Sequence, residues 1–223
     1  MMTKPRVLIA DDHSIFLAGL HRLVEDSCEV VGMVENGRAL VEAAGKLKPD
    51  LILLDISMPL LNGLDAAREI KKSEPDCKIL FLTMHASPTY ATEAIKAGGN
   101  GYLLKQSAAS ELSTAIEAVL GGQTYLTPAI TRSVLDSMLK PDSLALKRAV
   151  GDLTPRQREV LQLVGEGKGT KDIATLLNVS VKTVEFHKAR LMEQLEMHST
   201  ADLMKFAIAE GLASTDTISS EIE

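Results

Sequence analysis

Three acidic residues stand directly after two short aliphatic runs in the first half of the chain. Asp11 and Asp12 follow the run at 6–10, and Asp55 follows four branched aliphatic residues at 51–54. An aliphatic run without alternation is typical of a strand buried on both faces of a parallel sheet. Open α/β sheets bind ligands in the crevice outside the carboxyl ends of such strands. We therefore expect the three carboxylates to share that crevice, although Asp55 alone fits equally well as a solvated cap of the next helix.

Two further polar side chains end aliphatic runs in the same half of the chain. Thr83 ends the run at 78–83, and Lys105 ends the run at 101–105. Three neighbouring carboxylates repel one another and need a cation to coexist, and a set of oxygen ligands suits Mg²⁺, which also favours phosphate. Lys105 adds a point charge for a phosphoryl oxygen, and Thr83 adds a hydroxyl donor. The five residues predict phosphoryl transfer with a carboxylate as nucleophile.

These residues need a fold that brings the ends of several strands to one edge of a sheet. The hydrophobic pattern predicts that strands and helices alternate throughout this half of the chain. The expected strands are 6–10, 29–34, 51–54, 78–83 and 101–105, and the expected helices are 14–24, 39–47, 62–73, 88–97 and 108–120. Five consecutive βα units predict an α/β doubly wound, five-stranded parallel sheet.

Nine residues of this half form an ordered motif: Asp11, Asp12, Asp55, Met58, Pro59, Gly63, Thr83, Tyr102 and Lys105. With this motif, residues 5 to 121 resemble the receiver domain of two-component response regulators. The resemblance implies a flavodoxin-like fold in which Asp55 accepts a phosphoryl group from a sensor histidine kinase. One departure is Gln106, which stands where the family usually has proline after its active-site lysine.

The same resemblance implies roles for the other members of the group. Mg²⁺ would be held by three carboxylates and one backbone carbonyl, those of Asp11, Asp12, Asp55 and Ser57. Thr83 and Lys105 would contact the phosphoryl group, and Tyr102 would change rotamer as Thr83 moves. The implied chemistry is limited to self-phosphorylation and autodephosphorylation at Asp55, so we do not expect an enzyme that acts on other substrates.

Three other kinds of site fit the sequence less well. An aspartate-nucleophile phosphohydrolase needs a second carboxylate two residues after the nucleophile, and Ser57 stands there. Dinucleotide binding needs a glycine-rich turn after the first strand, where the chain has Asp11, Asp12 and His13. A transition-metal site made by Asp12, His13 and His85 lacks a histidine pair at helical spacing, so capping or solvated histidines are favoured.

The last third of the chain predicts a set of short helices. Thr154 and Pro155 have the residue types of a helix N-cap and first helical position, and an apolar stripe follows at 160–164. A second helix begins with Thr170 as its expected cap, and a third covers 181–195 after a tight turn. Two helices joined by a three-residue turn are typical of helix-turn-helix DNA-binding domains.

The residues of this segment also form a pattern that is shared with a known family of domains. The residues that carry the pattern are Leu153, Thr154, Arg156, Glu159, Val160, Leu161, Gly167, Lys171, Ile173, Ala174, Leu177, Val179, Ser180, Thr183, Val184, His187, Leu195, Gly211 and Leu212. In these residues it resembles the LuxR-type helix-turn-helix of NarL/FixJ response regulators, which implies a transcription factor. The third helix would lie in the major groove of double-stranded DNA. Its candidate outward residues are Lys182, Thr183, Phe186, His187, Lys188 and Arg190, and its inward residues are Val184, Leu191 and Leu195.

The charge of this segment is low for a DNA-binding domain. Residues 151–213 hold eight Lys and Arg against nine Asp and Glu, and the whole chain has a formal net charge of −6. Glu185 and Ala189 stand where many relatives carry basic residues, and Glu185 fits either as an acceptor for a cytosine amino group or as a surface charge. A single copy should bind weakly, so we expect a phosphorylated homodimer on a two-fold symmetric operator.

The dimer surface and the function leave alternatives open. The last helix, 200–210, offers an apolar face for dimerisation through Leu203, Phe206 and Ala207, although closing the small core of the domain would use part of that face. The low charge also allows a protein-interaction adaptor with little DNA binding as the alternative function.

We expect a receiver domain at 1–122, a linker with a short helix at 123–150, a DNA-binding domain at 151–213 and a disordered acidic tail at 214–223. No stretch resembles a signal peptide or a membrane span. Cys28 and Cys77 lack metal-site spacing and fit as buried side chains in a reducing compartment. These features predict a cytoplasmic protein without a membrane partner, and RNA polymerase is a candidate partner of a transcription factor.

Overall fold

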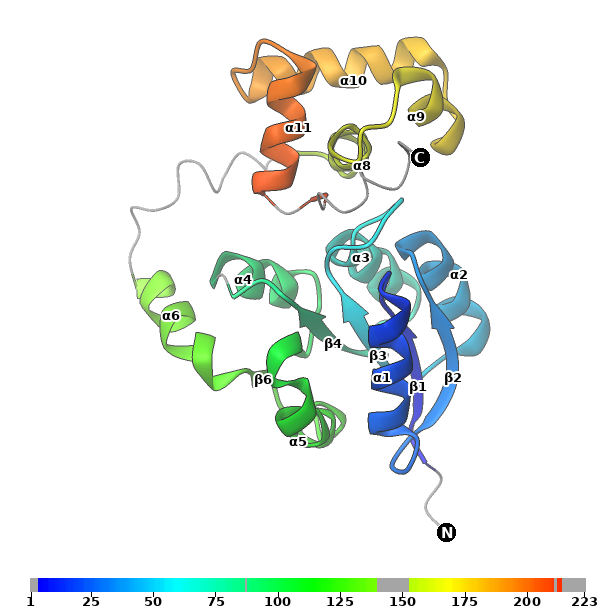
Figure 1. The fold of residues 1–223 in the computed structure, drawn as a ribbon, viewed down its shortest axis with the longest axis vertical. Helices are drawn as coiled ribbons and strands as arrows, with labels where there is room; N and C mark the ends of the chain where they lie inside the picture. The colour runs from blue at the N-terminus through cyan, green and yellow to red at the C-terminus, as the bar shows by residue number, and fades with distance from the viewer. Residues whose placement is uncertain (1–3, 87, 140–152, 211, 214–223) are drawn as a thin grey trace. The chain divides into compact units, whose positions relative to one another are not determined.

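Figure 1 shows two compact units in the computed structural model of the chain, which describes residues 4–86, 88–139, 153–210 and 212–213. The N-terminal unit ends with α6 (Pro128–Leu139), and the C-terminal unit begins with α8 (Pro155–Gly165). Each unit has a hydrophobic core of its own. Among the described residues, no helix is long and apolar enough to cross a membrane.

The N-terminal unit is built on a parallel sheet. Its strands are β1 (Arg6–Ala10), β2 (Glu29–Val34), β3 (Leu51–Asp55), β4 (Lys78–Thr83), β5 (Gly101–Leu104) and β6 (Tyr125–Leu126). They lie in the order β2-β1-β3-β4-β5-β6, and every pair is parallel. All five residues of β3 are buried, which agrees with its unbroken aliphatic sequence and confirms the parallel α/β prediction.

Helices cover both faces of this sheet (Figure 1). They are α1 (Ser14–Val24), α2 (Gly37–Leu47), α3 (Gly63–Ser73), α4 (Pro88–Lys96) and α5 (Ala108–Leu120), and the 3-10 turn η1 (Lys105–Ser107) precedes α5. The apolar side chains of α1 and α5 pack on one face, against residues such as Ile9, Leu53 and Leu103. The opposite face is covered by α2, α3 and α4 (Figure 1).

The sheet has six strands, so the expectation of five was wrong. The sixth strand has two residues, which are too few to show an alternating pattern in the sequence. Backbone hydrogen bonds hold it to β5: Tyr125 N–H donates to the Asn100 carbonyl over 3.2 Å, and Thr127 N–H donates to the Tyr102 carbonyl over 3.0 Å. The buried hydroxyl of Thr127 also accepts from Leu104 N–H at 3.0 Å. The first part of the expected linker is therefore an ordered part of the N-terminal unit.

The described residues of the C-terminal unit form four helices around a small core. They are α8, α9 (Thr170–Leu176), α10 (Val181–Gln194) and α11 (Thr200–Ala209). Thr154 and Gln157 form the reciprocal side-chain caps that begin α8, and the Ser180 hydroxyl caps α10. The expected cap of α9 was wrong by one residue: Gly169 is the N-cap, and Thr170 is already helical. The expected acidic tail lies outside the described residues.

The expected dimer face of α11 requires a correction. Leu203 and Ala207 are completely buried and belong to the core of the C-terminal unit, whereas Phe206 packs on that core and is partly exposed. The core needs these two side chains because α11 closes it against α8. Leu203 and Ala207 are therefore not available as a dimer surface in this structure.

Gly63→Ala should disturb the end of β3. A Cβ at Gly63 would lie 2.0 Å from the backbone oxygen of Asp55, and no side-chain rotation can relieve contact with backbone. We expect urea denaturation to show a loss of about 1–3 kcal/mol in the free energy of unfolding of the N-terminal unit. Gly19→Ala is the control, because a Cβ there meets nothing within 4 Å and alanine should stabilise α1 by about 0.5–1 kcal/mol. Equal stability of the two variants would contradict this packing.

Ser180→Ala should weaken the start of α10. The Ser180 hydroxyl accepts from Thr183 N–H at 3.1 Å, and loss of such a cap costs about 1 kcal/mol. We expect that loss in the helical unfolding transition of the C-terminal unit, followed by circular dichroism. Ser180→Asp keeps a hydrogen-bond acceptor at the cap, so the stability of this variant should be close to that of the unchanged chain. Identical stabilities for the alanine and aspartate variants would show that the cap contributes nothing.

Candidate functional site

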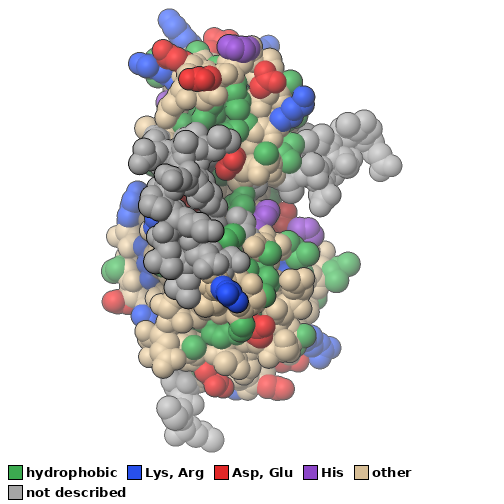
Figure 2. All heavy atoms as spheres, turned by 90° about the vertical axis from the view of Figure 1, so that its left-hand side faces the viewer, with side chains coloured by type: hydrophobic (Ala, Val, Ile, Leu, Met, Phe, Trp, Pro, Cys, Tyr) green, Lys and Arg blue, Asp and Glu red, His purple; other side chains and the backbone are tan. Residues whose placement is uncertain are grey.

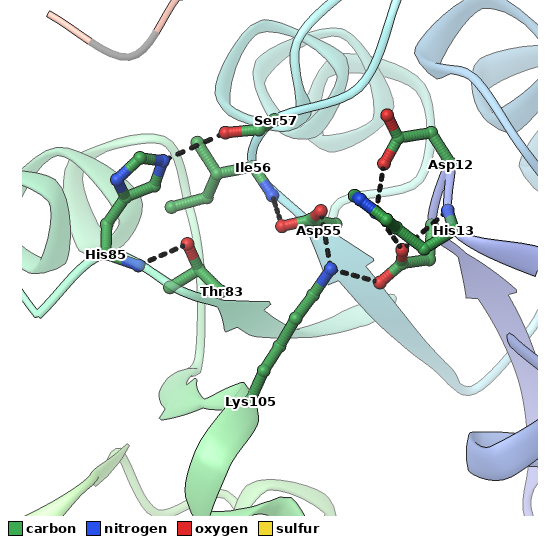
Figure 3. A network of polar contacts seen from close by, with 9 residues as sticks. Asp12, His13, Asp55, Ile56, Ser57, Thr83, His85 and Lys105 are labelled. Atoms are coloured by element: carbon green, nitrogen blue, oxygen red, sulfur yellow. Dashed lines mark hydrogen bonds and ion pairs between the residues drawn. The ribbon is translucent and has the colours of Figure 1, made fainter. Parts of the chain in front are cut away.

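The three acidic residues of the motif meet at the carboxyl edge of the sheet. Asp11 follows β1, Asp55 ends β3, and Asp12 and His13 lie beside them, with one potential ligand atom from each of the four within 4.8 Å of the others (Figure 3). Asp11 and Asp55 are buried. Adjacent positions of β1 and β3 in the sheet bring the two carboxylates together. The expectation of a shared crevice, drawn from spacing alone, is confirmed for these residues.

Lys105 joins two of the carboxylates. Its Nζ lies 2.7 Å from Asp11 Oδ2 and 2.8 Å from Asp55 Oδ2, and its side chain is buried (Figure 3). The ring of Phe16, on the first turn of α1, lies 4.7 Å from the same nitrogen in a cation–π contact. Sequence reasoning missed Phe16, since no local pattern indicates a contact with a lysine so far along the chain.

Burial and mutual repulsion control the charges of this cluster. Burial raises the pKa of the Asp55 carboxyl to about 6; the Lys105 ammonium opposes this rise, and the Asp11 carboxylate adds to it. Burial also raises the pKa of Asp12, against the opposing effect of His13. For Lys105, burial alone would lower the pKa, but the carboxylates of Asp55 and Asp11 reverse this effect and hold it above its usual value. One ammonium among three acids leaves an excess of negative charge, so this donor set fits a cation held by oxygen ligands.

A second group of polar contacts surrounds His85 at the end of β4. Thr83 is completely buried, and its hydroxyl accepts from His85 N–H at 3.1 Å. The Ser57 hydroxyl lies 2.9 Å from His85 Nε2 (Figure 3), and the ring stacks on Tyr90 with 4.4 Å between centroids. Tyr102 is buried, and its hydroxyl donates to the His85 carbonyl at 2.7 Å. The structure thus joins Thr83 and Tyr102 through the backbone of His85.

The resemblance to receiver domains also implies that Ser57 and His85 flank the site and tune how long a phosphoryl group lasts. Their direct contact could not be predicted from the sequence, because the two residues are 28 positions apart and no local spacing indicates it. The described residues also bear on the transition-metal alternative. His13 belongs to the acidic cluster, whereas His85 is bound to Ser57 and is not a member of that cluster.

The candidate DNA-binding residues of α10 divide into two sets. Lys182, Phe186 and Arg190 are exposed. The other three are partly buried and have partners within the unit. Thr183 contacts the cap residue Ser180, Lys188 lies 3.5 Å from the Thr170 hydroxyl, and the pKa of His187 is lowered by burial and by Arg156. The inward residues Val184 and Leu191 are completely buried, as expected, and Leu195 packs on the core.

The surface of the C-terminal unit carries both signs of charge. Figure 2 shows acidic and basic side chains interspersed on the face of this unit that it displays. On α10, the exposed face includes Glu185 and Ala189 beside the basic residues Lys182 and Arg190. The structure thus agrees with the low charge of this segment, and contact with DNA has to rely on few basic side chains.

Comparison with known proteins identifies both units. Residues 7–117 match the family of response regulator receiver domains, and residues 152–207 match the luxR family of bacterial regulatory proteins. The chain is 33% identical over 217 residues to the response regulator UvrY of Escherichia coli K12, covering 96% of this chain and 99% of UvrY. It is 35% identical over 214 residues to the oxygen regulatory protein NreC of Staphylococcus epidermidis, covering 93% and 98% of the two chains.

Solved structures give the same result. The RcsB response regulator of Salmonella typhimurium matches with a TM-score of 0.65 and 29% identity, over 93% of this chain and 98% of that chain. A structure of an RcsB–DNA complex matches with a TM-score of 0.58 and the same identity, over 93% and 99%. The two domain matches and the full-length relatives show that the chain belongs to the NarL/FixJ-type response regulators, which join a receiver domain to a LuxR-type helix-turn-helix.

Proposed function

We propose that this chain is a transcription regulator that is switched by phosphorylation of Asp55. The observation that supports this most strongly is the buried ammonium of Lys105 between Asp11 and Asp55 at the carboxyl edge of a parallel sheet. This arrangement supplies a carboxylate nucleophile and a fixed positive charge for the group that it receives. The proposed segments are a receiver at 1–122 and a DNA-binding domain at 151–213.

Asp55 is oriented before a phosphoryl donor arrives. Its Oδ1 accepts from the backbone N–H of Ile56 at 2.7 Å, and its Oδ2 accepts from Lys105 at 2.8 Å. A carboxylate oxygen of Asp55 attacks the phosphorus of a phosphohistidine on a sensor histidine kinase. A P–O bond forms as the P–N bond breaks, and the imidazole nitrogen leaves with the bonding electron pair. The product is an acyl phosphate, so the chain is both substrate and site.

The proposed cation is Mg²⁺, held by the carboxylates of Asp11, Asp12 and Asp55 and by the backbone carbonyl of Ser57. The donor set consists of oxygen atoms, and the excess negative charge of the cluster favours a small divalent ion. When bound, the ion supplies positive charge that offsets the carboxylates and the phosphoryl oxygens. Lys105 and Thr83 then supply the contacts of the protein to the phosphoryl oxygens.

Thr83 and Tyr102 are the proposed switch residues. The Thr83 hydroxyl accepts from His85 N–H, and the Tyr102 hydroxyl donates to the carbonyl of the same residue. A phosphoryl group on Asp55 offers new acceptors to the Thr83 hydroxyl, and rotation of that hydroxyl changes its contact with His85. Because the His85 ring stacks on Tyr90 in α4, this change reaches the surface formed by α4.

DNA binding by α10 is the proposed output. Its outward face carries Lys182 and Arg190 for phosphate contacts, and the helix-turn-helix arrangement supports a position of this helix in the major groove. Two copies double the phosphate contacts, which supports a phosphorylated homodimer on a two-fold symmetric operator. The DNA complexes known for RcsB favour this output over a protein-interaction adaptor.

Asp55→Asn should abolish phosphorylation. Acetyl phosphate with Mg²⁺ should add one phosphoryl group to the unchanged chain, measured by intact mass, whereas the amide of asparagine is a poor nucleophile. Asp76→Asn removes an exposed acid outside the cluster and should be phosphorylated normally. Chelation of Mg²⁺ should prevent the mass gain in the unchanged chain and in Asp76→Asn. Full phosphorylation of Asp55→Asn would refute the assignment of the phosphoacceptor.

Phosphorylation should convert the chain into a dimer that binds DNA. Light scattering should show doubling of the mass only after acetyl phosphate treatment, and affinity for a selected two-fold site should rise by at least about tenfold, because two sets of phosphate contacts act together. The affinity should fall steeply with salt concentration. Asp55→Asn should show neither change. A phosphorylated chain that gains no DNA affinity would instead support the adaptor function.

A further inference from the structure

The outward face of α10 holds five residues at helical spacing. They are Lys182, Glu185, Phe186, Ala189 and Arg190, and all five are exposed. Residues three or four positions apart lie on one side of a helix, so these five form a single row. The core packs against the other side of the helix, where Val184 and Leu191 are completely buried. This row is the part of α10 that can reach base edges in a major groove.

Glu185 is unusual in such a row. Lys182 stands one turn before it at the spacing of a helical ion pair, yet no ion pair joins Glu185 to any basic residue in the described part of the chain. Phosphate groups repel a carboxylate, so Glu185 would weaken non-specific contact with DNA. The base edge that favours a carboxylate in the major groove is the N4 amino group of cytosine, which donates a hydrogen bond.

Phe186 is equally unusual, because it is a large apolar side chain with 58% of its surface exposed. The guanidinium of Arg190 lies 5.7 Å from its ring centroid, and the His187 ring meets it edge-on at 5.6 Å. These contacts hold the ring on the outward face. The apolar group that a major groove offers to such a ring is the C5 methyl of thymine.

We propose that Glu185 selects a cytosine and Phe186 selects a thymine, on neighbouring base pairs of each half-site. This inference rests on the proposed function, because it needs α10 in the major groove. The two residues are adjacent in the helix, so their side chains leave it in directions about 100° apart, and this divergence suits contacts with neighbouring base pairs. Lys182 and Arg190 flank them and supply the phosphate contacts.

Selection from a random double-stranded library tests the role of Glu185, with the phosphorylated full-length chain and two variants. Glu185→Gln replaces the acceptor by an amide, which pairs with adenine. We expect one position of each half-site to change from cytosine to adenine, with a change on the order of tenfold in the ratio of the two bases. Glu196→Gln is the matched control: it removes one exposed acid just beyond the end of the same helix, and its selected site should equal that of the unchanged chain.

The role of Phe186 is tested on the selected site by replacing each thymine with uracil, which removes only the methyl group. The unchanged chain should lose affinity severalfold at one position of each half-site, whereas Phe186→Ala should bind the thymine and uracil forms equally. Both changed side chains are exposed, so the variants should fold, and circular dichroism checks this.

The outcomes separate the two proposals. If the phosphorylated chain selects no DNA sequence, the proposed function fails and this inference fails with it. If it selects a site but Glu185→Gln selects the same bases, or if uracil has no effect on the unchanged chain, the proposed function stands and the base assignment is overturned. A change confined to the cytosine position and a methyl effect that depends on Phe186 support both.

Discussion

The ion pairs between Lys105, Asp11 and Asp55 are the interaction on which the rest of the receiver depends. A buried charge without its partner costs about 3–5 kcal/mol, so the three side chains have to be placed together by the fold. The strand order puts β1 beside β3 but leaves β4 between β3 and β5. The side chains of Lys105 and the two acids therefore have to bridge two strand spacings to β3 and three to β1, about 10–15 Å, which requires a long side chain at position 105. Phe16 covers its ammonium on the side of α1.

The strand β5 connects this charged cluster to the rest of the N-terminal unit. Tyr102 lies within it and Lys105 follows it, so the aromatic switch residue and the ammonium share one short segment of backbone. The same strand holds Thr127 through the hydrogen bond from Leu104, and Thr127 immediately precedes α6. The end of β5 and the start of α6 are therefore joined directly through Thr127.

The C-terminal unit faces a different constraint, because α10 serves the core and the outer surface at once. Val184 and Leu191 are needed to bury apolar area in a unit of four short helices, and α11 has to contribute Leu203 and Ala207 to the same core. Small domains have little apolar surface to spare. Substitution in the exposed row of α10 therefore costs the fold less than substitution of these core residues.

The sequence alone determined the elements and the identity of the acidic cluster. The strands at 6–10, 29–34 and 78–83 and the helices at 14–24 and 108–120 have the same bounds in the structure, since the hydrophobic period is a local property of the sequence. The parallel order of these units then required Asp11, Asp55 and Lys105 to lie at one edge of the sheet.

Tertiary structure alone decided the contacts between distant segments. The pairing of Ser57 with His85, the ring of Phe16 beside Lys105 and the two-residue strand β6 have no local signal, because each depends on which side chains or backbone groups the packing brings together. The same reason explains α11, whose apolar residues fit a core and a dimer surface equally well until the position of α8 is known.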